Sequence, residues 1–379
     1  MAHWTSHLEN LPTPCYLIDE EKLTKNIQII QHIKQQSNCQ IILALKGFAT
    51  FSTFEKLKRD LDGVTASSIY EARLGYEEFK QAIHVHSIAM DEHECTQYNT
   101  IAEHISFNSL NQFNLFKSKN KSIKASLGIR VNPKCSQAPT EKYDPCAKFS
   151  RLGVPIDQIT PHLFDEIDGL HFHVLCEQNV HPLENVLNKI EETFGEHLKK
   201  LNWMNWGGGH LLTDENYNIK HLIQLINRWQ DKYGLKIILE PGEAIGRHCG
   251  YYVSRVLDII DNEQKIAICD ISATAHMPDV LEYPYRPEIA NSGEENEKNI
   301  TYIIGGNTCL AGDIIGTYSF DSPLSVNDML IFNDMGHYTI VKTSNFNGVK
   351  QPSIGMIDKS GNIKINMTSS YFNFKERLS

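Results

Sequence analysis

Short apolar runs alternate with amphipathic stretches from about Glu20 to Glu240, and this alternation constrains the possible fold more than any other feature. Eight runs are candidate strands: Ile41–Leu45, Gly63–Ala66, His84–Ala89, Ile105–Asn108, Ala125–Val131, Gly169–Val174, Leu201–Trp206 and Ile237–Leu239. Strands and helices in regular alternation indicate βα units and a parallel sheet. Eight such units within about 220 residues predict a closed (β/α)8 barrel rather than an open sheet.

The pattern changes after Gly246, where the segments typical of strands are joined by turns and few helical stretches are evident. The predicted strands are Tyr251–Ile260, Lys265–Ile271, Thr301–Ile304, Asp328–Ile331 and Tyr338–Lys342. We therefore expect an α/β barrel over residues 20–245 and a second, all-β domain formed by residues 1–19 and 246–379. The acidic segment Glu288–Asn299 is predicted to be a solvated loop.

Composition excludes several classes of protein. Of the 379 residues 41% are hydrophobic and 22% charged, which argues against disorder. The net charge of -10 would repel nucleic acid, and no apolar run reaches the roughly 18 residues that a membrane-spanning helix needs. The first residues lack a secretory pattern, and the nine scattered cysteines form no C-x-x-C pair, so we expect a cytoplasmic protein without a disulfide framework.

Polar residues end or follow the candidate strands, where a barrel gathers its reactive groups. These residues are Lys46, Ser67, Asn108, Arg130, His171, His173, Gly207, Gly208, Gly209 and Glu240. Lys46 follows an apolar run, so burial would lower its pKa and free the amine to bond an aldehyde. The alternative is a lysine that simply emerges at the end of a strand.

His171 and His173 lie two residues apart, on one face of a candidate strand. They could bind zinc, but we expect one packed histidine, one functional histidine and no metal. The glycines Gly207–Gly209 could wrap an anion or form a tight turn. Glu240, in the segment EPGE, could keep a pyridine nitrogen protonated or could belong to a capped turn.

Two segments of the second domain add candidate residues. The segment GGNTCLAGD places Cys309 and Asp313 among glycines, where a cysteine can move a proton or can be a small buried residue. In the segment DMGHYT, Tyr338 could donate its hydroxyl to a phosphate or serve only in packing.

The order of these residues resembles the fold-type III pyridoxal-phosphate decarboxylases, and the resemblance extends from PTPCYLID to DMGHYT. Within that group, the segments SATAHMPDVLEYPYRPEI and NWGGGHLL are similar to those of carboxynorspermidine decarboxylases. The resemblance implies pyridoxal 5'-phosphate as cofactor. It also implies that the chain decarboxylates carboxynorspermidine and carboxyspermidine to norspermidine and spermidine in polyamine biosynthesis.

The resemblance also implies a role for individual residues. Lys46 matches the lysine that bonds the cofactor covalently, His173 the histidine that stacks on its ring, and Glu240 the partner of its pyridine nitrogen. Gly207–Gly209 match the glycines that bind its phosphate, with Tyr338 as a further phosphate ligand.

Cys309 matches a cysteine that enters the active site of the neighbouring subunit, so the resemblance implies a homodimer with shared active sites. Arg130 and Glu71 also lie at positions typical of the family.

Departures from diaminopimelate decarboxylases indicate the substrate. Where those enzymes carry arginines that pair with a second carboxylate, this chain has Glu243 and Met277–Pro278. A carboxylate here suits an ammonium group, so Glu243, Asp279 and Asp313 are the candidates for binding the amino groups of a polyamine.

Several alternatives remain open. One is a decarboxylase of the same fold acting on diaminopimelate or another basic amino acid, and another is a racemase. A protein that binds pyridoxal phosphate without turnover is a third. A zinc hydrolase requires that both His171 and His173 bind metal.

Overall fold

The computed structural model describes residues 4, 8, 10–136 and 141–379. Contacts between Cα atoms divide the chain into two compact units, Asn26–Ile245 and a second unit that combines Met1–Lys25 with Gly246–Ser379. Residues 1–3, 5–7 and 9 of the expected N-terminal part of the second domain lie outside the described residues.

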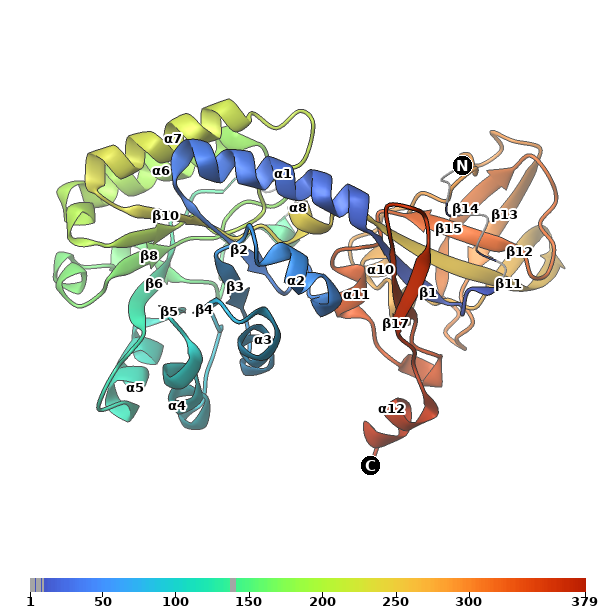
Figure 1. Ribbon diagram of the computed structural model, residues 1–379, viewed down its shortest axis with the longest axis horizontal. Coiled ribbons are helices and arrows are strands. Elements are labelled where there is room, and N and C mark those ends of the chain that lie inside the picture. Colours follow the sequence, from blue (N-terminus) through green and yellow to red (C-terminus); the bar gives the residue numbers. More distant parts are fainter. Residues whose placement is uncertain (1–3, 5–7, 9, 137–140) are drawn as a thin grey trace. The chain divides into compact units, whose positions relative to one another are not determined.

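The first unit contains a closed barrel of eight parallel strands (Figure 1). Its strands are β2 (Gln40–Ala44), β3 (Gly63–Ala66), β4 (Ala82–Val85), β5 (His104–Phe107), β6 (Ser126–Asn132), β8 (Gly169–His171), β9 (Trp203–Asn205) and β10 (Lys236–Leu239). Pairing of β10 with β2 and of β5 with β6 closes the ring. The short strand β7 (Val154–Pro155) adds to β6. The predicted (β/α)8 barrel is confirmed.

Helices precede, separate and follow the barrel strands along the chain (Figure 1). They are α1 (Glu20–Ser37), α2 (Phe54–Leu57), α3 (Ile69–Leu74), α4 (Glu92–Ile101), α5 (Leu110–Lys119), α6 (Val180–Phe194), α7 (Ile219–Tyr233) and α8 (Glu243–Gly246). In α6 the buried residues recur at helical spacing, as in Leu183, Val186 and Leu187, so one face is apolar. Polar caps fix where α3, α6 and α7 begin, at Ser68, Asn179 and Asn218.

Trp203 fills the barrel interior next to two glycines of neighbouring strands. A Cβ atom on Gly169 would lie 2.1 Å from the indole of Trp203, and one on Gly128 would lie 2.3 Å from it. Only glycine leaves room for this side chain, because interiors pack to the density of crystals. The indole nitrogen donates to the hydroxyl of Ser126 at 2.8 Å.

The second unit contains an eight-stranded mixed sheet with the order β14-β13-β12-β11-β1-β16-β17, and β15 pairs with β11. The strands are β1 (Cys15–Asp19), β11 (Gly250–Asn262), β12 (Gln264–Cys269), β13 (Ile300–Gly305), β14 (Ile314–Phe320), β15 (Met329–Asn333), β16 (Ser353–Ile357) and β17 (Ile363–Met367). Its helices are α9 (Ala273–His276), α10 (Asp279–Glu282), α11 (Thr339–Lys342) and α12 (Tyr371–Glu376). A buried apolar cluster that includes Tyr16 and Tyr252, whose rings stack 4.2 Å apart, forms a core of this unit.

The prediction of a strand over Tyr338–Lys342 is wrong, because this segment forms the single turn α11. Its β-branched residues favour a strand, but strand propensity depends on the surroundings. The helical turn packs Ile340 against the apolar cluster and directs Lys342 to Asp279 and Glu282. Tertiary contacts therefore override the local preference.

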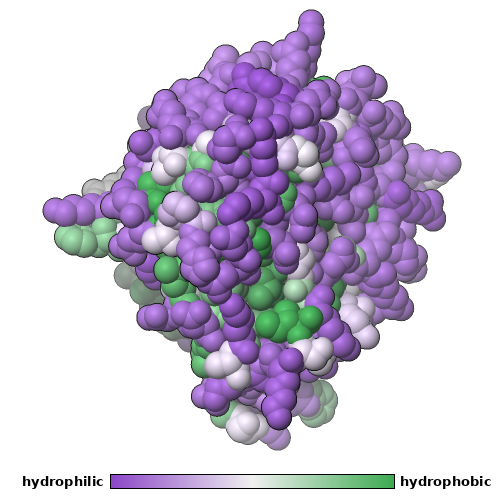
Figure 2. Space-filling view, turned by 90° about the vertical axis from the view of Figure 1, so that its left-hand side faces the viewer, coloured by the Kyte–Doolittle hydropathy of each residue, from purple (hydrophilic) through white to green (hydrophobic). Residues whose placement is uncertain are grey.

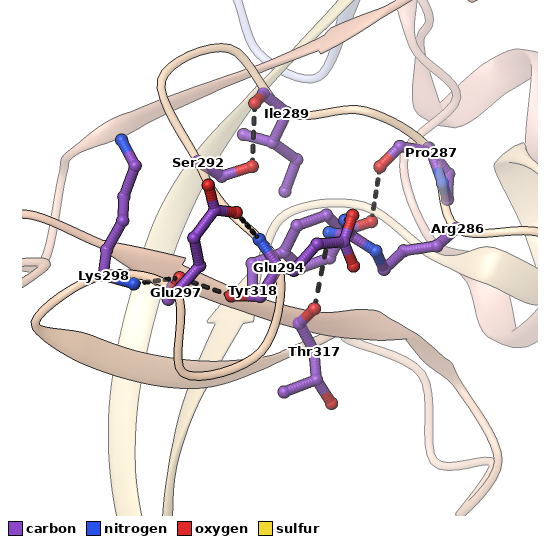
Figure 3. A network of polar contacts seen from close by, with 10 residues as sticks. Arg286, Pro287, Ile289, Ser292, Glu294, Glu297, Lys298, Thr317 and Tyr318 are labelled. Atoms are coloured by element: carbon purple, nitrogen blue, oxygen red, sulfur yellow. Dashed lines mark hydrogen bonds and ion pairs between the residues drawn. The ribbon is translucent and has the colours of Figure 1, made fainter.

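The segment Glu288–Asn299 is only partly the solvated loop that the sequence predicts (Figure 3). Ile289 is buried in the apolar cluster. The guanidinium of Arg286 lies 4.5 Å from the centre of the Tyr318 ring and pairs with Glu294, and the Tyr318 hydroxyl donates to the carbonyl of Pro287 at 2.6 Å. These contacts hold the base of the loop, while its acidic tip is exposed.

Hydrophilic residues cover most of the face drawn in Figure 2, and apolar residues appear between them in small groups. Among the helices of the described residues, none has both the length and the apolar character needed to cross a bilayer. None of the nine cysteines, all of which lie among the described residues, forms a disulfide, and the side chain of Cys309 is exposed.

Candidate active site

Side chains from six barrel strands, or from the residues just after them, line one cavity. Its lining residues are Ala44, Lys46, Thr65, Ser67, His86, Arg130, His171, His173 and Glu240. The carboxyl ends of parallel strands share one edge of the barrel, which is why residues so distant in sequence converge. The structure therefore brings together six residues that were singled out from the sequence: Lys46, Ser67, Arg130, His171, His173 and Glu240.

Lys46 follows β2 and is exposed within this cavity. The surrounding protein still removes much of the water around its amine, and the charge of Arg130 adds repulsion. Both effects lower the pKa of Lys46, with desolvation the larger. A larger neutral fraction of the amine at neutral pH is what a nucleophilic lysine requires.

Glu240 follows β10 and is buried. Burial raises the pKa of its carboxyl group, while a hydrogen bond from Asn205 opposes that rise. The Nδ2 atom of Asn205 donates to Oε1 of Glu240 at 2.6 Å. Nε2 of His171 lies 3.8 Å from Oε2, and both ring nitrogens of this buried histidine lack a hydrogen-bond partner. His171 is thus a buried lining residue whose pKa lies well below its ordinary value because of desolvation.

The three glycines Gly207–Gly209 follow β9 and pass close to neighbouring backbone. A Cβ atom on Gly207, Gly208 or Gly209 would lie 2.5, 2.4 or 2.0 Å from a carbonyl oxygen, and Gly207 and Gly209 have φ angles of +70° and +80°. A side chain is therefore excluded at each position. The amide of Gly208 donates to Nδ1 of His173 at 2.9 Å, which orients the imidazole.

Arg130 and His86 form a pair next to His173. Arg130 was singled out from the sequence and His86 was not. One guanidinium nitrogen of Arg130 lies 2.8 Å from Nε2 of His86, and the other donates to the carbonyl of His173 at 3.1 Å. Burial, followed by the charge of Arg130, lowers the pKa of His86 to about 3. His86 lies in the third candidate strand and was not singled out from the sequence, because its role depends on Arg130 from another strand.

Two acidic residues lie beside the segments that bear Lys46 and Glu240. The carboxylate of Glu71, at the start of α3, accepts from the amide of Ser67 at 2.6 Å, and its charge favours the protonated form of Lys46. Glu243 is half-buried, and a Cβ atom on Gly47 would lie 3.1 Å from its backbone nitrogen. The first turn of α8 therefore adjoins the segment that follows Lys46.

The remaining predicted residues lie in the second unit. Cys309 is exposed in the loop between β13 and β14, where its amide donates to Asn347 at 2.7 Å. Tyr338 is half-buried just before α11, with a φ of +47°. Asp279 begins α10 and pairs with Lys342.

Asp313 is buried, and its carboxylate is hydrogen-bonded to its own loop and to the start of α9. Its carboxylate accepts from the hydroxyls of Thr308 and Ser272, at 2.6 and 3.0 Å, and from the amide of Ala273 at 2.7 Å. These contacts favour a role in holding the loop that carries Cys309. A carboxylate with this many donors has little remaining capacity for a substrate ammonium.

The donor set in the cavity fits pyridoxal phosphate. An amine with a lowered pKa suits the aldehyde, a buried carboxylate suits the pyridine nitrogen, and glycines have no side chain that would keep a phosphate from their backbone. Ligand atoms of His171, His173 and Glu240 also lie within 4.8 Å of one another, so geometry alone would permit a metal ion. Comparison with known proteins distinguishes a site for pyridoxal phosphate from a site for a metal ion.

The family model for pyridoxal-dependent decarboxylases, described as their C-terminal sheet domain, matches residues 15–336. A carboxyaminopropylagmatine decarboxylase of Synechocystis sp. is 41% identical over 98% of this chain and 96% of its own length. A carboxynorspermidine/carboxyspermidine decarboxylase of Campylobacter jejuni is 40% identical over 97% of this chain and 99% of its own.

Solved structures agree with these matches. The carboxynorspermidine decarboxylase of Campylobacter jejuni, crystallised with norspermidine, superposes with a TM-score of 0.89 at 38% identity, over 97% of this chain and 100% of that one. Diaminopimelate decarboxylase of Helicobacter pylori shares the fold at 19% identity, with a TM-score of 0.84 over 98% of both chains. The chain thus belongs to the pyridoxal-dependent decarboxylase family.

Proposed function

We propose that the chain decarboxylates carboxynorspermidine and carboxyspermidine, giving norspermidine and spermidine. The observation that carries the proposal is the convergence of Lys46, His173 and Glu240 in one cavity, in a chain 40% identical to a carboxynorspermidine/carboxyspermidine decarboxylase. The same similarity supports pyridoxal 5'-phosphate as cofactor and a role in polyamine biosynthesis.

Pyridoxal phosphate, when bound, supplies an aldehyde for amines and a ring that takes up the electron pair left by departing carbon dioxide. Lys46 would hold it covalently until the substrate amine takes the place of Lys46. Glu240, kept ionised in part by the Asn205 amide and by Lys46, would retain a proton on the ring nitrogen. His173, oriented by Gly208, would lie against the ring. Gly207–Gly209 and Tyr338 would bind the phosphate.

Cys309 is proposed to act in the active site of a partner subunit of a homodimer, where its thiol gives a proton to Cα of the substrate after carbon dioxide leaves. Its exposure supports access to such a site. The nine unpaired cysteines are consistent with a reducing compartment, so we propose that the dimer works in the cytoplasm.

Shared active sites can be tested by mixing two inactive variants, Lys46→Ala and Cys309→Ala. Random exchange of subunits should restore about a quarter of wild-type activity, because half the dimers are mixed and each has one intact site. The subunits exchange when the mixture is unfolded and refolded. Each variant alone, treated in the same way, is the control. A mixture as inactive as its components would contradict a partner's Cys309.

A second substrate, carboxyaminopropylagmatine, is favoured by one observation. The Synechocystis relative named for that substrate is as similar to this chain as the Campylobacter relative is. The two substrate classes differ at one end, where an ammonium or a guanidinium must be bound. A carboxylate such as Glu243 suits both, and a guanidinium can pair with it through two parallel hydrogen bonds.

Carbon dioxide release from a panel of acids tests these assignments. We expect turnover of carboxynorspermidine and carboxyspermidine, slower turnover of carboxyaminopropylagmatine, and none of meso-diaminopimelate, whose distal ammonium has a carboxylate beside it that Glu243 would repel. Release from diaminopimelate alone would overturn the proposed substrate class, and release from none of them would favour binding without turnover.

Variants identify the carboxylate that binds the distal amine. Glu243→Gln should raise KM with little change in kcat, whereas Glu192→Gln, on the exposed face of α6, should change neither. If the substrate ammonium replaces Lys342 as the partner of Asp279, Asp279→Asn should be the variant that raises KM.

Asp313→Asn should lower the midpoint of thermal unfolding, because it disturbs a buried carboxylate whose hydrogen bonds are satisfied.

A further inference from the structure

Three potential metal ligands meet on the surface between α6 and α7, away from the cavity residues. His181 and Glu184 lie on α6, and His221 lies on α7. One ligand atom from each lies within 4.8 Å of the others. Nε2 of His221 is 3.0 Å from Oε2 of Glu184, and the two imidazole rings are 5.6 Å apart.

We propose that His181, Glu184 and His221 bind one divalent transition-metal ion of the zinc class. Two imidazoles and one carboxylate are a ligand set that zinc accepts, and a fourth position remains for water. His181 is exposed and the other two are half-buried, so an ion can enter from solvent. Binding requires that the three side chains rotate to bring their donor atoms, now within 4.8 Å of one another, to bonding distance.

Two electrostatic effects oppose a cation at this place and determine which cations can bind. His181 and His221 lie in the first turns of their helices, where the positive dipole ends repel cations. In addition, Arg228 lies 3.8 Å from the second carboxylate oxygen of Glu184. Binding must therefore come from coordination by imidazole nitrogen, which magnesium and calcium do not favour.

The site lies at the end of a series of contacts that starts at the glycine turn. The amide of Gln178 donates to the carbonyl of Gly209 at 3.0 Å, and the amide of Leu211 donates to the carbonyl of Gln178 at 3.2 Å. The side chain of Asn179 donates to the carbonyl of Asn216 at 2.8 Å. An ion between α6 and α7 would extend this series and fasten the two loops that carry His173 and the glycines.

Calorimetric titration of the purified holoenzyme with zinc chloride, in the presence of a phosphine reductant, tests the site. The wild type should bind one zinc ion that raises the midpoint of thermal unfolding, and magnesium chloride should do neither. His221→Asn should weaken this binding by about tenfold or more and abolish the shift in midpoint. His162→Asn is the matched control, because His162 is an exposed histidine beside Asp165 and Glu166 on another segment.

A second variant keeps all three ligands, so its result does not depend on whether His221→Asn folds correctly. Arg228→Gln removes the competing cation and should bind zinc more tightly than the wild type. Unchanged or weaker binding by Arg228→Gln would contradict the position assigned to the ion. The site is also refuted if the wild type binds no zinc, or if His221→Asn binds it as the wild type does. These readouts need no turnover, so they are independent of the proposed reaction.

Discussion

Asn205 joins two parts of the candidate active site at the scale of a single residue. Its amide nitrogen donates to Glu240, and its amide oxygen accepts from the backbone of Gly207 at 2.8 Å. The side chain is buried at the end of β9, and Trp206 separates it from the glycine turn. One amide thus fixes both the carboxylate proposed for the ring nitrogen and the first glycine proposed for the phosphate.

Replacing Asn205 with alanine should weaken binding of pyridoxal phosphate. The change removes one of the hydrogen bonds to the buried carboxylate of Glu240 and the partner of the buried amide of Gly207, and an unpartnered buried group costs about 1–3 kcal/mol. We expect the Kd of the cofactor to rise roughly tenfold or more, measured by titrating apoenzyme and following absorbance. Asn227→Ala, whose amide bonds the carbonyl of Gln36 on the outside of the barrel, is the control. An unchanged Kd for Asn205→Ala would show that this amide does not support the site.

At the scale of elements, the barrel strands were predictable because short apolar runs and the spacing of apolar residues indicate strands and helices locally. Lys46, His173 and Glu240 were predictable for a related reason, since a parallel barrel brings the ends of its strands together. Asn205 and His86 were not singled out, because their importance depends on partners from other strands. Strand β14 was missed since its polar and glycine residues mask the apolar ones, and α11 was mistaken for a strand because tertiary packing overrides β-branched propensity.

A glycine in β8 makes the packing of the barrel testable. Gly169→Ala would place a methyl group 2.1 Å from the indole of Trp203, so strands or side chains must shift. Overpacking of this kind typically costs about 1–3 kcal/mol, and the midpoint of thermal unfolding should fall by several degrees. Gly312→Ala is the control, because no atom lies within 4 Å of its added Cβ. Equal stability of the two variants would mean that Trp203 does not fill the barrel as described.

Buried histidines make the stability of the whole molecule depend on pH. Burial lowers the pKa of His104, His210 and His276 to about 4, whereas an unfolded histidine titrates near 6.5. The unfolded state therefore binds more protons than the folded state between these values. The stabilisation is fully present above about pH 6.5 and is lost as the pH falls toward 4.

This pH dependence can be measured by urea unfolding at pH 7 and pH 5. Each such histidine should contribute about 1–2 kcal/mol to the loss of stability between the two values. His276→Gln should therefore lose less stability on acidification than the wild type, while the exposed His93→Gln should lose as much. The prediction fails if His276→Gln and the wild type show the same difference between pH 7 and pH 5.

The central claim for the whole molecule is that Lys46 bonds the cofactor aldehyde in the barrel cavity. Borohydride reduction of the protein loaded with pyridoxal phosphate, followed by peptide mass mapping, tests it most directly. We predict a single phosphopyridoxyl label on the peptide that contains Lys46, and no label and no carbon dioxide release with Lys46→Ala. A label on a different lysine, or turnover by the Lys46→Ala variant, would contradict the account.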